Sequence, residues 1–385
     1  MSLSGKVALA GVYEHPARWA PDKTDWQIMA ESARGALEDC GLEKGDVDGL
    51  LAAGLGMGGL GLIQLSEYLD LKPRFVDGTN IGGSSFVAHV NHAAAAIHAG
   101  LCEVALILYG STAASNAMAI GTGGQAGREP SAAFVSPYGL TTVGGYAMAA
   151  QLHMRRYGTT SEQLAQIAVQ TRKHASLNPA AKMQKPITIE DVLASRVISD
   201  PLHLLDCCII SDGGGALVVT STERARDLRK RPVRLLGCGE AVWHQETGSP
   251  DLLTIAARQS GERAFEMAGL TPREIDLAMV YDSFTITVLL TLENLGFCKP
   301  GEGGPFVEGE RLSRTGELPL NLDGGGLSSN HPGMRGIFLV IEAVKQLRGE
   351  SGPRQVADPS LALVHGTGGL LTTQHSGATL VLGSD

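Results

Sequence analysis

The segment Ala36-Leu37-Glu38-Asp39-Cys40-Gly41-Leu42, followed by Val47-Asp48, occurs again as Ala264-Phe265-Glu266-Met267-Ala268-Gly269-Leu270, followed at the same spacing by Ile275-Asp276. Each copy is typical of an amphipathic helix that ends at a glycine and leads through a short charged loop into an apolar strand. The expected strands cover residues 49–53 and 277–281. The repeat predicts a chain that consists of two similar halves.

A second repeated pattern closes each half. Residues 211–219 and residues 375–382 both read as a turn that leads into a strand rich in β-branched side chains. Strands and helices alternate in both halves, which favours a layered α/β architecture with largely parallel central strands. We therefore expect two similar halves packed as layers.

One long segment has no counterpart in the other half. Residues 111–201 combine Gly/Ser/Pro-rich stretches with two helical patterns, at 146–157 and 161–176. Insertions over the end of a sheet commonly build ligand sites. The predicted organisation is an N-terminal half from residues 1–110 and 202–230, an inserted loop domain from 111–201, and a C-terminal half from 231–385.

Composition narrows the class of protein. A chain of 385 residues with 43% hydrophobic content can bury a large core, and its formal net charge of -9 leaves no basic footprint for nucleic acid. No apolar run reaches the length of a transmembrane helix, and six cysteines without metal-ligand spacing favour reduced thiols. We expect a cytoplasmic protein without a resident metal, a nucleic-acid partner or a membrane span.

Basic residues concentrate in the inserted segment. Such a cluster favours an anionic small molecule as ligand, although solvated helix faces account for most charges of this kind. The residues are Arg155, Arg156, Arg172, Lys173, Lys182, Lys185 and Arg196.

Four further sequence motifs follow one another along the chain. They are residues 157–165, Ser211-Asp212-Gly213, residues 281–285 with 292–297, and Asn321-Leu322-Asp323-Gly324-Gly325-Gly326 through His331-Pro332. The ordered set resembles the thiolase superfamily, and most closely its sterol-carrier-protein-type thiolases and lipid-transfer-protein-like enzymes. The resemblance implies a duplicated thiolase fold with two βαβαβαββ-type halves, a homodimer, and a CoA thioester as substrate. It also implies a small partner subunit with an OB-fold and a zinc ribbon.

The family's nucleophilic cysteine is missing from this chain. In the family it stands at a helix N-terminus, and counting back from Gly100 puts that position at Gly83, with a one-residue uncertainty towards Gly82. The six thiols lie outside the matched active-site positions. The backbone N–H groups of Gly83 and Ser84 would still face a thioester oxygen. A hydroxyl of Ser84 or Ser85 is an alternative nucleophile, but serines at helix N-termini are usually caps.

The other three loops of the family's active site keep acid–base groups. Tyr281 replaces the usual His or Asn of one motif, His331 matches the His of the Gly-His-Pro motif, and His365 stands at the position of a second cysteine. A buried Tyr or a single His is more often structural, and only the position inside the motifs favours catalysis. The resemblance implies Tyr281, His331 and His365 as catalytic residues, Gly83, Ser84 and Gly368 as backbone donors, and Asp282 and Asn321 as supporting residues.

The missing cysteine bears on the reaction. Claisen-type acyl transfer needs an acyl-enzyme, whereas retro-aldol cleavage of a 3-hydroxyacyl-CoA needs only a base and a site for the enolate oxygen. We predict an enzyme that makes or breaks a C–C bond beside a thioester, with Tyr281 or His365 as base and His331 at the enolate. Acyltransferase chemistry of the acetyl-CoA acetyltransferase kind stays in view. The expected cofactor is only the CoA of the substrate, bound within residues 111–201.

Two other functions remain open. A degenerate member of the family would be a non-catalytic carrier of acyl-CoA or lipid, or a scaffold subunit. The pattern Gly56-Met57-Gly58-Gly59-Leu60-Gly61, with Asp77 further on, formally matches a dinucleotide fingerprint and would indicate an NAD-dependent dehydrogenase. His89 and His92 lie one helical turn apart, but without a third ligand we interpret them as packing residues. No pattern selects the acyl group.

Overall fold

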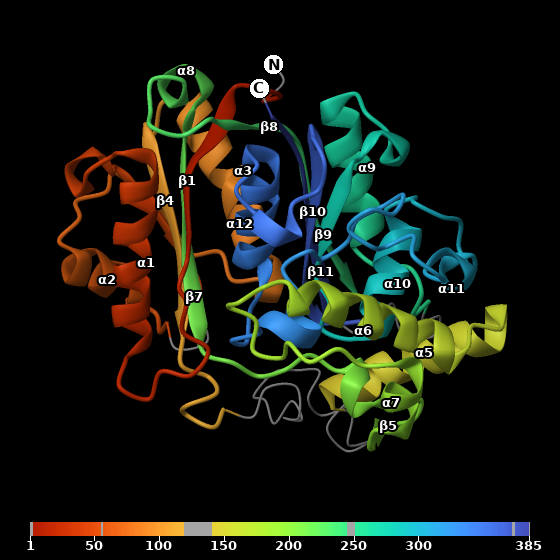
Figure 1. The fold of residues 1–385 in the computed structure, drawn as a ribbon. Helices are drawn as coiled ribbons and strands as arrows, with labels where there is room; N and C mark the ends of the chain where they lie inside the picture. Colours follow the sequence, from red (N-terminus) through yellow and green to blue (C-terminus); the bar gives the residue numbers. More distant parts are fainter. Residues whose placement is uncertain (1–2, 55–56, 119–140, 245–250, 372–373, 385) are drawn as a thin grey trace.

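The computed structural model describes residues 3–54, 57–118, 141–244, 251–371 and 374–384 (Figure 1). In chain order the elements of its first half are β1 (Val7–Glu14), α1 (Asp25–Cys40), β2 (Gly49–Ala52), α2 (Gly61–Leu69), β3 (Phe75–Asp77), α3 (Ser85–His98), β4 (Val104–Ser111), β7 (Gly213–Ser221) and the short α8 (Thr222–Ala225). Five strands of this half lie side by side in the order β3-β2-β4-β7-β1. If the five are counted along the chain, with β7 as the fifth, this order is 3-2-4-5-1.

The second half repeats this arrangement. Its elements are β8 (Val233–His244), α9 (Ala257–Ala268), β9 (Leu277–Val280), α10 (Thr285–Asn294), α11 (Gly303–Phe306), α12 (Gly336–Arg348), β10 (Leu361–Leu370) and β11 (Gln374–Ser384). From the centre outwards the strands follow as β8-β11-β10-β9, and Leu320 bridges in parallel to Ala278 of β9 where the first half has its β3. The order is therefore 1-5-4-2-3, the reverse of the first half, and the predicted duplication is confirmed.

The strand directions differ from the prediction in the middle of the sheet. β2 pairs in parallel with β3 and β4, and β9 with β10, as crossover helices require. However, β7 and β11 run against both of their neighbours, and β1 pairs antiparallel with β8 through Ala8 and Leu9. The last strand of each half thus reverses direction, which the alternation of strands and helices in the sequence does not reveal.

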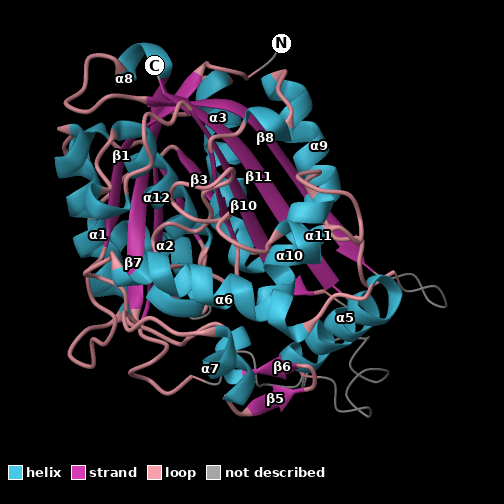
Figure 2. Cartoon of the chain, turned by 45° about the vertical axis from the view of Figure 1, so that its right-hand side comes forward, coloured by secondary structure: helices cyan, strands magenta, loops and turns pink. Residues whose placement is uncertain are grey.

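Helices α3 and α12 form the middle layer of the molecule. Each contacts strands of both halves, and Figures 1 and 2 show both helices between the two parts of the sheet, which meet only at the seam of β1 and β8. On the outer faces, α1 packs on β1, β4 and β7, and α9 packs on β8 and β11. The loops that precede α3 and α12 consequently meet: a Cβ on Gly336 would touch the carbonyl oxygen of Gly83.

The repeated segments fold as their sequence predicts. α1 begins at a capping box in which the Thr24 hydroxyl accepts from Gln27 N, and it ends at Gly41 with φ of 78°. α9 ends in the same way at Gly269 with φ of 67°. Both glycines adopt the left-handed conformation that L-residues disfavour, which explains their place in the two copies.

The inserted segment packs on the second half, although it interrupts the first half in sequence. Its elements are α5 (Thr142–Tyr157), α6 (Ser161–Ser176), α7 (Ile189–Ala194) and β5 (Val197–Ser199), and β5 pairs with β6 (Leu202–His203), which follows directly after it. α5 and α6 both contact α10 and share one apolar core with it. Residues 119–140 of this segment lie outside the described part of the chain, and the domain boundaries stay a prediction. Among the described residues, no helix is long and apolar enough to cross a lipid bilayer.

Candidate active site

A cavity of about 800 Å³ lies where α3 and α12 begin and β9 and β10 end. Most of its wall is apolar, as expected for a site that buries a ligand. The predicted loops contribute Gly82, Gly83, Tyr281, Ser283, Phe284, His331, Gly333, Met334, Thr367, Gly368 and Gly369. The inserted segment and the chain around it contribute Met118, Thr142, Val143, Tyr146, Arg196, Ile198, Leu204, Cys207, Cys208 and Ile210.

The ring of Tyr281 occupies the space that a side chain at position 83 would need. A Cβ on Gly83 would lie 2.6 Å from Tyr281 Cζ and 2.6 Å from the carbonyl oxygen of Thr367. Neither neighbour can be cleared by a small shift, because one belongs to a ring 4% exposed and the other to the backbone of β10. The loss of the cysteine and the gain of the tyrosine are therefore sterically linked.

Tyr281 and His331 form a hydrogen-bonded pair at the wall of the cavity. The phenolic oxygen lies 2.9 Å from His331 Nε2, and the two rings meet edge to face with centroids 5.6 Å apart. Within the described part of the chain, His331 Nδ1 has no hydrogen-bond partner. The sequence placed these two groups in one site, and the structure brings them into direct contact.

Burial keeps both members of this pair neutral at neutral pH. Burial, with a smaller effect of the nearby Arg335 cation, lowers the pKa of His331 to about 4. Burial also raises the pKa of Tyr281 well above its usual value. A neutral phenol next to a neutral imidazole can pass one proton along one hydrogen bond, which is what general acid–base chemistry requires.

A buried arginine, which was not predicted from the sequence, holds the loop that carries His331 in place. Arg335 is fully buried and donates to both oxygens of Asp323 at 2.7 and 2.6 Å, and to Asn330 Oδ1 at 2.6 Å. Its Nε lies 3.3 Å from Asp282 Oδ1. The available signal was one cation directly before the apolar run that forms α12. Buried charges survive only when paired in this way.

The two supporting residues predicted from the sequence hold backbone and do not line the cavity. Asp282 accepts from Gly326 N at 2.7 Å and Leu327 N at 3.1 Å, and burial raises its pKa to about 6. Asn321 Oδ1 accepts from Val280 N at 2.8 Å, one residue before Tyr281. Both residues fix the strand end that carries Tyr281.

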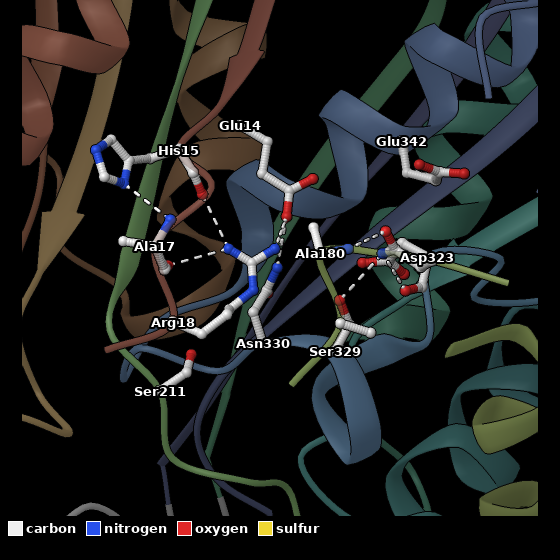
Figure 3. Close-up of polar contacts among 12 residues, drawn as sticks. Glu14, His15, Ala17, Arg18, Ala180, Ser211, Asp323, Ser329, Asn330 and Glu342 are labelled. Carbon is white, nitrogen blue, oxygen red and sulfur yellow. Dashed lines mark hydrogen bonds and ion pairs between the residues drawn. The ribbon is translucent and has the colours of Figure 1, made fainter. Parts of the chain in front are cut away.

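The same polar network reaches the first half of the chain. Asn330 Nδ2 donates to Glu14 Oε1 at 2.9 Å, and Figure 3 shows this carboxylate between Arg18 and Asn330. His331 N donates to Ser211 Oγ at 3.0 Å. The loop of His331 is thus fixed from β1 on one side and from the segment before β7 on the other.

His365 lies outside the cavity, and its predicted role as a base is not supported. Neighbouring residues of a strand face opposite sides, and Gly366 faces Ser84 and Val87 in the middle layer. His365 therefore faces the outer layer, where its Nδ1 lies 2.9 Å from Thr379 Oγ1. Burial, and then His375 nearby, lower its pKa to about 3. The motif alignment placed the residue correctly along the chain but on the wrong face of β10.

The serines at the start of α3 are tied to backbone. Ser84 Oγ donates to the carbonyl oxygen of Ile81 at 2.9 Å, and Ser85 Oγ donates to that of Gly82 at 2.7 Å. Both side chains are fully buried and neither lines the cavity. This geometry gives no support to a covalent serine, while the role of Ser84 as a backbone donor stays a prediction.

Two thiols line the cavity, although all six lie outside the active-site positions matched from the sequence. Cys207 and Cys208 follow the inserted segment and reach the wall close to Tyr281. Burial raises the pKa of Cys207 to about 12 and raises that of Cys208 as well. Both remain neutral thiols and are poor nucleophiles at neutral pH.

Most of the basic residues of the inserted segment have structural partners. Arg172 Nε donates to Ser328 Oγ at 2.7 Å, Lys173 pairs with Glu310 at 2.6 Å, and Lys182 Nζ donates to the carbonyl oxygen of Ile210 at 2.7 Å. Of the seven residues considered above, Arg196 is the one that lines the cavity, and its side chain is exposed.

The dinucleotide interpretation finds no support in the geometry. Asp77, its candidate ribose ligand, accepts from Thr79 N at 2.8 Å and lies 2.5 Å from His92 Nδ1. Its carboxylate is therefore already engaged. Gly56 of the fingerprint lies outside the described residues.

Comparisons with known proteins agree with this geometry. The family model described as thiolase C-terminal domain-like matches residues 239–384. The steroid side-chain-cleaving aldolase of Thermomonospora curvata is 36% identical, covering 100% of this chain and 99% of the relative. The 17-hydroxy-3-oxo-4-pregnene-20-carboxyl-CoA lyase of Mycobacterium tuberculosis is 34% identical, covering 91% and 93%. The solved Ltp2-ChsH2(DUF35) aldolase superposes with a TM-score of 0.89 at 35% identity, covering 100% and 99%.

The chain belongs to the thiolase superfamily. Its place in the sterol-carrier-protein-type branch and its duplicated thiolase fold are as predicted from the sequence. The protein is a thiolase-superfamily enzyme, and the names of its relatives, an aldolase and a CoA lyase, confirm the predicted class of C–C bond chemistry.

Proposed function

We propose that this enzyme cleaves the Cα–Cβ bond of a 3-hydroxyacyl-CoA by a retro-aldol reaction without an acyl-enzyme. The observation that carries the proposal is the pair of Tyr281 and His331, 2.9 Å apart, with the ring of Tyr281 in the space that a side chain at position 83 would need. When a proton-transfer group stands in place of the nucleophile, the site is suited to proton abstraction and not to acylation.

The proton of the substrate hydroxyl moves first in this mechanism. The oxygen of Tyr281 takes it while the phenol passes its own proton to His331 Nε2. The electrons of the O–H bond form the carbonyl of the leaving ketone or aldehyde, and the Cα–Cβ bond breaks. The electron pair of that bond enters the thioester as an enolate. The proton held by His331 returns through Tyr281 to the α-carbon, so no water and no free CoA are consumed.

Backbone donors stabilise the enolate oxygen. The first N–H groups of a helix have no intrahelical partner and carry the positive end of its dipole. The N–H groups of Gly83 and Ser84 lie in the turn directly before α3, where a Cβ on Gly83 would lie 2.6 Å from the carbonyl oxygen of Thr367, the residue before Gly368. Preorganised donors of this kind are worth several kcal/mol to a developing oxyanion.

The acyl group is bulky and apolar in this proposal. A cavity of about 800 Å³ with a mostly apolar wall suits a polycyclic acid, and both enzymes compared above are named for steroid substrates. The CoA enters between the inserted segment and the active-site loops. Arg196, at the exposed rim, meets its phosphates through charge-assisted contacts.

Two partners complete the proposal. β3 is an edge strand, and Val76 within it is 52% exposed, which favours antiparallel pairing with β3 of a second copy in a homodimer. The Ltp2-ChsH2(DUF35) aldolase contains a second component, and this supports a small partner subunit for the present enzyme.

The test is product analysis with a 3-hydroxyacyl-CoA that carries a bulky polycyclic acyl group, with and without a co-expressed partner subunit. The proposal expects the shortened acyl-CoA and the carbonyl product in equal amounts without free CoA. Cleavage only of a 3-oxoacyl-CoA, and only with free CoA, would identify a thiolase. Salt-sensitive binding without turnover, measured by calorimetry, would identify a carrier.

A further inference from the structure

The segment between β3 and α3 carries Gly83 into the active site, and a carboxylate fixes its beginning. Asp77, the last residue of β3, accepts through Oδ1 from Thr79 N at 2.8 Å and from Thr79 Oγ1 at 2.7 Å. These two bonds set the direction in which the chain leaves the strand. Gly83 follows four residues after Thr79.

Two histidines of α3, one turn apart, hold the same segment. His89 Nε2 lies 3.0 Å from the carbonyl oxygen of Thr79, which can only accept, so this nitrogen carries the proton. His92 Nδ1 lies 2.5 Å from Asp77 Oδ2. His89 therefore holds the backbone carbonyl of Thr79, and Asp77 holds its backbone N–H. His92 in turn holds the carboxylate of Asp77.

The second half of the chain supplies the last member of the set. Glu240, on β8, places Oε2 3.0 Å from His92 Nε2. Hydrogen bonds to the carboxylates of Asp77 and then Glu240 raise the pKa of His92 to about 10, so the ring is charged and both of its nitrogens donate. A doubly protonated imidazole has no lone pair for a metal ion, which removes the metal reading of His89 and His92.

The far end of the segment is packed tightly against β10 and β11. A Cβ on Gly82 would lie 2.9 Å from Gly368 Cα, and the carbonyl oxygen of Ile81 accepts from Ser84 Oγ and from Ser376 Oγ at 2.5 Å. Thr79 is fixed at the beginning of the segment, and Ile81 and Gly82 are packed against β10 and β11 directly before Gly83, so the backbone that leads into Gly83 has little freedom.

We propose that Asp77, His92 and Glu240, together with His89, are positioning residues that hold the backbone of Gly83 against the Tyr281–His331 pair. None of the four lines the cavity. They act through the hydrogen bonds to Thr79 and not on the substrate itself. Three of these residues, Asp77, His92 and Glu240, carry a charge. The set joins the two halves, because β3 and α3 supply Asp77 and the histidines whereas β8 supplies Glu240. The proposal rests on the proposed lyase function.

The experiment compares Asp77→Asn, His92→Gln and Glu240→Gln with wild type in steady-state turnover of the 3-hydroxyacyl-CoA. A displaced backbone donor costs rate more than affinity, so kcat should fall on the order of tenfold to a hundredfold in Asp77→Asn while KM stays within about twofold. His92→Gln should cost less and Glu240→Gln least, because each acts one contact further from Thr79. In the double variant His92→Gln/Glu240→Gln, kcat should recover part of the loss of His92→Gln, since the second change removes an unpaired carboxylate.

Asp48→Asn is the matched control. Asp48 lies at the opposite end of the strand pair β2–β3 and does the same kind of work: it accepts from Val104 N at 2.8 Å and from Arg74 Nε at 2.9 Å. It should lower the melting temperature as much as Asp77→Asn while leaving kcat within twofold of wild type. Equal losses of kcat in both variants, or wild-type kcat in Asp77→Asn and His92→Gln, would overturn the proposal.

A second readout is independent of turnover. Hydrogen exchange at the amides of residues 82–84 should speed up in Asp77→Asn and His92→Gln but not in Asp48→Asn. If the wild type shows no lyase activity, the proposed function fails while this readout still decides the positioning role. If the wild type is active and exchange is unchanged in both variants, only the positioning role fails.

Discussion

The loops that precede α3 and α12 occupy equivalent places in the two halves and have opposite character. The loop before α3 brings two glycines to the cavity, and its serines are bound to its own backbone. The loop before α12 brings His331, with the buried Arg335 behind it. In the proposed mechanism the loop before α3 supplies backbone and the loop before α12 supplies a side chain, so the duplicated loops have separate tasks.

One steric contact explains why the division is stable. The Tyr281 ring and a side chain at position 83 cannot share the space between the two loops. A side chain added at position 83 alone would clash with the ring, and a small residue at position 281 alone would leave a gap. This division can be tested by removing side chains of the second half and by adding a side chain to the first.

The largest effect is expected from Tyr281→Phe and His331→Ala. Each removes one end of the 2.9 Å contact that moves the proton, and loss of such a group typically lowers kcat on the order of a hundredfold or more. The double variant should be little worse than either single one, because the two groups act as a unit. Rates are measured as formation of shortened acyl-CoA, with circular dichroism as a check of folding.

Wild-type turnover in either single variant would contradict the role of that residue. Full additivity in the double variant would mean that the two groups act in separate steps.

The sequence predicted those parts of the site that depend on position along the chain. The repeat at Gly41 and Gly269 revealed the duplication, and motif order predicted that Gly83, Tyr281 and His331 share one site, where all three line the same cavity. It could not give the face of a strand, because a shift of one residue reverses the side: His365 points to the outer layer for this reason. It also could not bring Cys208 to the cavity, since that contact joins segments far apart in sequence.

The next largest effect is expected from Gly83→Ala. Its single methyl must displace Tyr281 or the backbone of Thr367, and overpacking of this kind costs about 1–3 kcal/mol of stability. Movement of the phenol away from His331 should lower kcat on the order of tenfold or more. Thermal melting and turnover together measure both effects.

Two comparisons make this test specific. Gly59→Ala is the control, because nothing lies within 4 Å of a Cβ at that glycine and its backbone is ordinary. Gly83→Cys/Tyr281→Asn removes the clash with the ring but keeps the one with the carbonyl oxygen of Thr367, and it should melt higher than Gly83→Cys alone. Equal melting of these two variants would show that Tyr281 is not what excludes a side chain from position 83.

The histidines of the two halves should give pH effects of opposite sign. His331 and His375 have pKa values lowered to about 4 and about 3, mainly by burial, whereas an unfolded His titrates near ~6.5. The unfolded chain binds more protons below ~6.5, so their contribution to stability is complete above that pH and is lost as the pH falls towards 4. His92, with its pKa raised to about 10, contributes fully below ~6.5 and loses its contribution as the pH rises through 10.

Urea unfolding between pH 4 and pH 10 measures these contributions. His375→Gln should flatten the acid limb of the stability profile and leave the alkaline limb alone. His92→Gln should do the reverse. Parallel profiles for the two variants would contradict the assignment of charge states.

The smallest effect is expected from the thiols of the cavity. If no acyl-enzyme forms, Cys207→Ala/Cys208→Ala should lower kcat only a few-fold, through altered packing next to Tyr281. Iodoacetamide is informative only in this double variant, because in the wild type an adduct on either thiol would obstruct the cavity whatever the mechanism.

In the double variant, iodoacetamide should leave the remaining rate nearly intact, and mass spectrometry after incubation with acyl-CoA should find no acyl adduct. A loss of more than a hundredfold on removing the two thiols, together with an acyl adduct on the wild type, would mean that a cysteine from after the inserted segment has replaced the one missing at Gly83. The enzyme would then differ from an ordinary thiolase in the position of its nucleophile and not in its chemistry.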